Sequence, residues 1–129
     1  MDLTGNITIA KQTLSKFEIT SVVSGTGKKD VIIDLGLSEE EIDKLVAEVN
    51  AGTKTAFFTA MSDSNLIDDS NTGSSNAVTA VAKEGTDKIK LTLTDDLTAG
   101  DYVSVEFKGS GLYVAHEAVI AGPAADAAP

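Results

Sequence analysis

The chain has 129 residues, a length that suits one domain with a core of its own. Twenty Asp and Glu residues against ten Lys, with no Arg, give a formal net charge of −10. Because nucleic acids and anionic membrane surfaces are bound chiefly through Lys and Arg, neither is an expected partner. Aromatic residues make up only 5% and Trp is absent, so the core must consist mainly of Val, Ile, Leu and Ala.

The chain contains no cysteine, which excludes disulfides, thiolate metal sites and cysteine nucleophiles. Residues 1–6 have neither the basic start nor the apolar run of a secretory signal, and no apolar stretch approaches 18 residues. We therefore expect a protein that is not secreted by a visible signal and does not span a membrane, while the lack of cysteine leaves its compartment open. The Asn6-Ile-Thr8 sequon is then expected to stay unmodified, because glycosylation requires the secretory route.

Alternation of apolar and polar residues predicts strands along most of the chain. The clearest pattern is at 87–94 and returns at 101–108. Between them, residues 95–100 include the Asp and Gly residues of a turn, so we expect these two strands to form an antiparallel hairpin with one apolar face. Six further strands are expected, at 6–10, 17–24, 31–33, 54–60, 76–83 and 112–120.

One helix is expected at about residues 38–51. Ser38 and Glu41 have the spacing of a capping box, and three consecutive glutamates place negative charge at the positive end of the helix dipole. Gly52 is expected to end the helix. Apolar residues recur at the spacing of one helix face, at positions 42, 45, 46 and 49.

Together these elements predict a mainly β fold: an antiparallel β-sandwich or barrel-like domain of about eight strands, with one helix covering an end or an edge. We assign residues 1–120 to this single domain. Residues 121–129 are rich in Ala and contain two Pro, and they have no periodicity. We expect them to form an arm that packs as neither helix nor strand within the domain and lies against another subunit.

Several groups of residues invite a functional interpretation, and we assign no catalytic, cofactor or metal site to any of them. Gly25, Gly27 and Lys28 resemble part of a phosphate loop, but Val22 stands where the first glycine of that motif is required, so a turn is expected. The carboxylates of residues 39–41 point about 100° apart on a helix and do not converge on one atom.

His116 is the only histidine, and without a second ligand or an activated nucleophile it is expected to be a surface or interface residue. The polar stretch 61–75 offers oxygen ligands for a cation, but it lacks the glycine and the distal glutamate of a calcium-binding EF-hand loop. We expect a solvated or partner-contacting loop, and cation binding there remains open. The oxygen donors of this loop are Asp63, Asn65, Asp68, Asp69 and Asn71.

Two resemblances bear on function. Residues 97–105, Leu-Thr-Ala-Gly-Asp-Tyr-Val-Ser-Val, resemble the Ala-Gly-Asp-Tyr turn and strand of bacterial immunoglobulin-like modules, although the Cys and Trp of true immunoglobulin domains are absent. This resemblance implies a sandwich and, as one function, a binding module of a bacterial surface or adhesive protein.

The chain as a whole is small, acidic, cysteine-free and β-rich, with an Ala/Pro arm. In this it resembles the capsid decoration, or cement, proteins of tailed bacteriophages. That resemblance implies a non-enzymatic virion component on the capsid surface, made in the host cytoplasm. Its partner would be the major capsid protein or another assembly subunit, and such proteins are often homo-oligomers, commonly trimers. An enzyme is the remaining alternative, but no pair of carboxylates falls in a motif with a known role.

Overall fold

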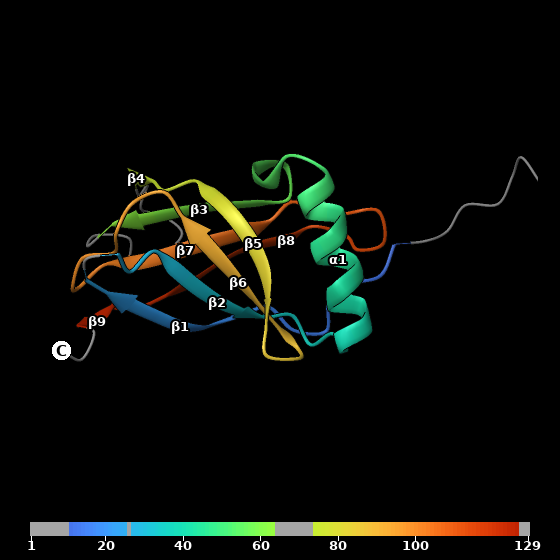
Figure 1. Ribbon diagram of the computed structural model, residues 1–129, viewed down its shortest axis with the longest axis horizontal. Coiled ribbons are helices and arrows are strands. Elements are labelled where there is room, and N and C mark those ends of the chain that lie inside the picture. Colours follow the sequence, from blue (N-terminus) through green and yellow to red (C-terminus); the bar gives the residue numbers. More distant parts are fainter. Residues whose placement is uncertain (1–10, 26, 64–73, 127–129) are drawn as a thin grey trace, which may run out of the picture.

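The protein is a β-sandwich with one helix across one end (Figure 1). The computed structural model describes residues 11–25, 27–63 and 74–126. Within these residues the two sheets remain separate, which confirms the predicted mainly β fold and selects the sandwich over the barrel. No helix in this part of the chain has the length and apolar character needed to cross a membrane.

The first sheet has five strands in the order β5-β6-β2-β1-β9. Neighbouring strands are antiparallel, except that β9 runs parallel to β1. In sheet order the strands are β5 (Val78–Glu84), β6 (Lys88–Leu93), β2 (Asp30–Asp34), β1 (Glu18–Ser24) and β9 (Ala125–Asp126).

The second sheet has four antiparallel strands in the order β4-β3-β7-β8. These are β4 (Ser74–Ser75), β3 (Phe58–Asp63), β7 (Tyr102–Phe107) and β8 (His116–Ala121). Both β4 and β9 are only two residues long, so the sandwich consists mainly of four strands facing three.

The core lies between the sheets and follows the alternation of the sequence. Alternate residues of β2, β6 and β7 are fully buried, while their neighbours in the sequence mostly face outward. Phe58 and Phe107 pack against each other with ring centroids 5.2 Å apart. Aliphatic side chains supply most of the remaining core, as the low aromatic content predicts.

Helix α1 (Glu39–Ala51) begins at the predicted cap. The Glu41 backbone N–H donates to Ser38 Oγ, and the Ser38 backbone N–H donates to Glu41 Oε1, which confirms the capping box. Gly52 follows the helix in an extended conformation. The predicted strand at 54–60 starts later than expected, because Lys54–Ala56 forms a short 3-10 helix, η1, before β3 begins.

The predicted hairpin of 87–94 with 101–108 is wrong, although both strands exist. Strand β6 pairs with β2 and β5, whereas β7 pairs with β3 and β8 in the other sheet. The connection 95–100 crosses between the sheets, and Leu97 within it is only 1% exposed. Its N–H donates to the Lys28 carbonyl and its carbonyl accepts from the Gly25 N–H, each at 2.9 Å. The connection is therefore tied to the β1–β2 turn.

The expected arm partly belongs to the domain. Ala124 is buried, its N–H donates to the Asp101 carbonyl at 2.7 Å, and its carbonyl accepts from the Gly100 N–H at 3.0 Å. The next two residues form β9, paired with β1 at the end of the sandwich away from α1 (Figure 1). The expectation that no strand forms beyond residue 120 is thus wrong, since backbone pairing needs no large side chain.

The last strand is shorter than predicted. Strand β8 begins at His116, and Tyr113 instead forms an isolated parallel bridge with Gln12. The predicted strand at 6–10, residues 64–73 of the polar loop and the last three residues lie outside the described part of the chain.

Candidate interaction face

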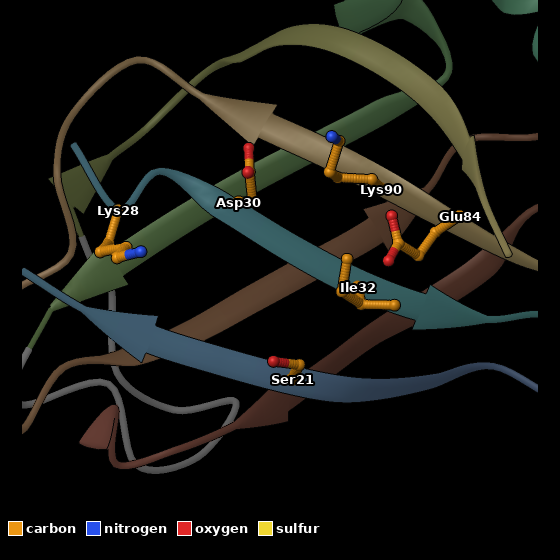
Figure 2. A pocket seen from close by; sticks show the side chains of 6 residues that line it. All are labelled: Ser21, Lys28, Asp30, Ile32, Glu84 and Lys90. Carbon is orange, nitrogen blue, oxygen red and sulfur yellow. The ribbon is translucent and has the colours of Figure 1, made fainter. Parts of the chain in front are cut away.

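A hollow of about 300 Å³ lies on the exposed side of the five-stranded sheet (Figure 2). We call this side of the sheet, which faces away from the four-stranded sheet, the outer face. Six residues line the hollow: Ser21, Lys28, Asp30, Ile32, Glu84 and Lys90.

Strand alternation brings these side chains to one surface. On β2, Val31 and Ile33 are fully buried, so Asp30 and Ile32 point outward. The register then places Lys90 of β6 directly beside Ile32. Ile32 is half-buried and lies between Ser21 on one side and the charged Lys90 and Glu84 on the other (Figure 2).

Paired residues form three rows across the outer face. The first is a charged row, the second is the row of Ile32, and the third joins a carboxylate to a hydroxyl. In the order β1, β2, β6, β5 the rows are Glu18-Asp34-Lys88-Glu84, Ser21-Ile32-Lys90-Ala82 and, from β2 onward, Asp30-Thr92-Ala80.

The charged row is fixed by local bonds. The backbone N–H of Gly36 donates to Asp34 Oδ1 at 3.0 Å, and Lys16 Nζ lies 3.2 Å from Asp34 Oδ2. The hydrogen bond from the Gly36 N–H is the main cause that lowers the pKa of the Asp34 carboxyl, and the nearby Lys16 ammonium lowers it further. In turn, the Asp34 carboxylate raises the pKa of the Lys16 ammonium, which also lies 3.6 Å from Glu18. This end of the outer face therefore carries charges of both signs that local bonds hold in place.

Two lysines at the hollow are unpaired within the part of the chain that the structure describes. Neither Lys28 nor Lys90 forms an ion pair with any described residue. Asp30 accepts a hydrogen bond from the Thr92 hydroxyl at 2.8 Å. An apolar centre with two available ammonium groups and two carboxylates at its rim suits contact with another protein surface.

A second hollow of about 230 Å³ lies between α1 and the segment that leads to β8. Its charged groups are already engaged: Glu48 accepts from the Gly111 N–H at 2.8 Å, and Lys44 pairs with Glu40 at 3.5 Å. The Tyr113 hydroxyl donates to Glu41 Oε2 at 2.9 Å. Leu112, at 43% exposure, forms part of the wall. The outer face is the better candidate because Lys28 and Lys90 at its hollow have no ion-pair partner among the described residues.

Most of the residues that drew attention in the sequence have structural partners. Glu39 and Asp43 both pair with Lys83, at 2.8 and 3.0 Å. The His116 ring stacks on Phe17 with centroids 4.9 Å apart. The glycine-rich stretch is a turn as predicted, since the Lys28 N–H donates to the Gly25 carbonyl at 3.0 Å.

Glu41 combines the helix cap with the bond to Tyr113. Its pKa is lowered, first by the Ser38 backbone N–H and then by the Tyr113 hydroxyl. The pKa of Tyr113 is raised, chiefly by burial. The sequence gives no sign of this pair, because the two residues lie 72 positions apart.

Among the described residues, no three His, Cys, Asp or Glu side chains are grouped so that they could hold a metal ion. Of the five oxygen donors in the polar loop, only Asp63, at the end of β3, lies in the described part. The predicted loop function is therefore outside what the structure describes.

Comparison of the chain with protein-family models, with curated proteins and with solved structures gives no match. The function is therefore argued from the strand arrangement and the outer face.

Proposed function

We propose that the protein is a non-enzymatic structural protein: an immunoglobulin-like module that decorates or cements a larger assembly, namely a bacteriophage capsid. It would be made in the host cytoplasm and act on the capsid surface. Its partners would be the major capsid protein or other assembly subunits, together with further copies of itself.

The observation that carries the architectural part of this proposal is the strand order. Lettered A to G in chain order, the seven strands of five or more residues lie as D-E-B-A in one sheet and C-F-G in the other. This is the order of the constant-type immunoglobulin sandwich, a frame shared by many cell-surface domains. Helix α1 lies in the connection from B to C. The Ala-Gly-Asp-Tyr stretch leads into strand F, β7.

The charge and the outer face support attachment to an assembly. A net charge of −10 keeps crowded copies soluble and away from nucleic acid. A small face with few strong contacts binds weakly as one copy, but repetition on a lattice multiplies the strength of attachment. Such a protein therefore needs a well-defined surface more than a deep pocket.

The alternative is a binding module of a bacterial surface or adhesive protein, and the same strand order favours it. The two functions differ in the object that is bound. A decoration protein binds an assembled shell, whereas an adhesive module binds the cell exterior.

Co-sedimentation distinguishes them. The purified protein is mixed with shells assembled from a major capsid protein encoded beside it, and separately with intact bacterial cells. We expect it to sediment with the shells. Charge reversal on the outer face, Lys90→Glu, should weaken shell binding, while Lys44→Glu on α1 serves as the matched control. Protein that stays in the supernatant with shells but sediments with cells would contradict the capsid assignment and favour the alternative.

A further inference from the structure

We infer that the outer face binds the same face of a second copy of this chain, about a two-fold axis that runs parallel to the strands between β2 and β6. This inference names the occupant of the candidate face and rests on the proposed non-enzymatic binding role. In such a dimer the shell is bound by the surfaces that the two copies leave exposed, and Lys90→Glu weakens shell binding because it separates the copies and so reduces the number of contacts.

The register of β2 and β6 makes this arrangement self-complementary. A two-fold axis midway between these strands places each β2 residue over its β6 row partner in the other copy. The charged pair within the sheet, Asp34 with Lys88, is thereby repeated twice between the copies. Asp30 similarly comes to face Thr92, which already donates to the Asp30 carboxylate within one copy. The β2–β6 pairs of Asp34 with Lys88 and of Asp30 with Thr92 therefore recur across the interface.

The central row supplies the apolar contact. Lys90 of the second copy lies over Ile32, and its aliphatic stem can cover this half-buried side chain while its ammonium stays at the rim. Ser21 and Ala82 at the ends of the row are small and permit close approach. Asp30 and Glu84 line the hollow that the stem enters, so the ammonium gains a carboxylate partner, which it lacks among the described residues of its own copy (Figure 2).

The charge balance favours a second copy over a strongly charged partner. The chain carries twice as many carboxylates as lysines, yet on and beside the outer face the two are nearly equal. Two copies can therefore approach there while their acidic surfaces point away from each other. The lysines are Lys16, Lys28, Lys88 and Lys90, and the carboxylates are Glu18, Asp30, Asp34, Glu84 and Asp87.

The one like-charge contact involves the outer strands, where Glu84 would come to face Glu18 of the other copy. Lys16 already lies 3.6 Å from Glu18 and reduces this repulsion. The twist between packed sheets, about 30°, also separates their outer strands more than their central ones.

Charge complementation between two variants tests the inference. Lys88→Glu and Asp34→Lys each place like charges opposite each other twice in a dimer of identical chains. In a mixture of the two variants, both contacts become attractive. Light scattering with size exclusion and sedimentation equilibrium, on the protein alone, should show a native dimer. Each single variant should dissociate about tenfold more readily, and a mixed dimer should form when the two are combined.

Asp34→Lys also removes the hydrogen bond from the Gly36 N–H and could disturb folding. A second pair of variants therefore tests the dimer without changing this bond. Ile32→Glu removes no side-chain hydrogen bond among the described residues. This variant should abolish the dimer. Lys44→Glu on α1 should leave it intact.

A native protein that is monomeric at every concentration would overturn the inference, as would dimers that Ile32→Glu and both charge variants leave unchanged. The measurement is independent of capsid binding. A monomer that still sediments with shells rejects only the dimer, whereas a dimer that binds no shell rejects only the capsid assignment.

Discussion

At the scale of single residues, the pair of Tyr113 and Glu41 joins the helix cap to the segment before β8. The Tyr113 ring is buried, and its hydroxyl donates to the Glu41 carboxylate at 2.9 Å. Because the hydroxyl and the Ser38 N–H both favour the ionised carboxyl, they lower the pKa of Glu41. The bond therefore contributes more to stability while Glu41 is charged than after it is protonated.

The Tyr113→Phe variant tests this contribution. A carboxyl with a lowered pKa stabilises the fold fully above its ordinary pKa, about 4.3 for Glu, and this stabilisation is lost as pH falls through the lowered value. We expect Tyr113→Phe to melt at a lower temperature than the native protein at pH 7, with the difference closing in acid. Thermal melts between pH 7 and pH 2 would show it. A difference that is constant over this range would mean that only packing was lost.

At the scale of elements, the sequence predicts what each strand buries but not which strand it pairs with. The alternation in 87–94 and 101–108 places the apolar side chains correctly. The same alternation is expected for a hairpin and for two strands in facing sheets, because in both cases each strand buries one of its two faces. The deciding contacts are distant in sequence, such as the bonds between Leu97 and the β1–β2 turn. The helix start, which depends on residues three apart, is predicted correctly.

The candidate face was missed for the same reason. Lys90, Ile32 and Ser21 belong to three strands and become one surface only through their register. Within each strand they have the ordinary pattern of outward-facing residues. In the sequence Lys28 suggests only a possible phosphate loop, because its position at the rim of the hollow depends on the turn that carries it.

Asn76 also makes a contact between residues distant in sequence. Its side chain binds Asp95, the first residue of the connection 95–100 that crosses between the sheets. Asn76 is 1% exposed, its Nδ2 donates to the Asp95 carbonyl at 3.2 Å, and its Oδ1 accepts from the Asp95 N–H at 2.8 Å. Asn76→Ala leaves these groups unpaired, so we expect a loss of about 1–3 kcal/mol in the free energy of unfolding.

Urea denaturation would measure this loss. Thr94→Ala is the matched control, since the exposed Thr94 hydroxyl donates to the Ala77 carbonyl near the same connection. The Asn76 variant should lose clearly more stability than this control. Equal losses would show that Asn76 has no special role in holding the crossing.

At the scale of the whole molecule, the segment that leads from β8 to β9 links the two sheets. Gly122 has a φ of 144°, and a Cβ at this position would lie 2.8 Å from the Asp101 carbonyl oxygen and 2.9 Å from Tyr102 Cα. Any side chain would therefore push the segment away from β7. The buried Ala124 and the pairing of β9 with β1 depend on this close approach.

We expect Gly122→Ala to release this segment and to lower the melting temperature by several degrees, consistent with a loss of about 1–3 kcal/mol. Gly85→Ala in the β5–β6 turn is the control, because Gly85 also has a positive φ, 63°, but nothing within 4 Å of an added Cβ. Hydrogen exchange should show faster exchange of the Ala124 amide in the Gly122 variant. Unchanged exchange there would contradict the link.

In the proposed function, this sandwich acts through the outer face of its five-stranded sheet. The most direct test follows the methyl resonances of isoleucines by NMR over a range of protein concentrations. Ile32 lies in the proposed contact, and its neighbour Ile33 is fully buried in the core and provides an internal reference. We predict that the Ile32 resonance shifts as copies associate while that of Ile33 stays in place. An Ile32 resonance that does not move while the measured mass doubles would show that another surface makes the contact.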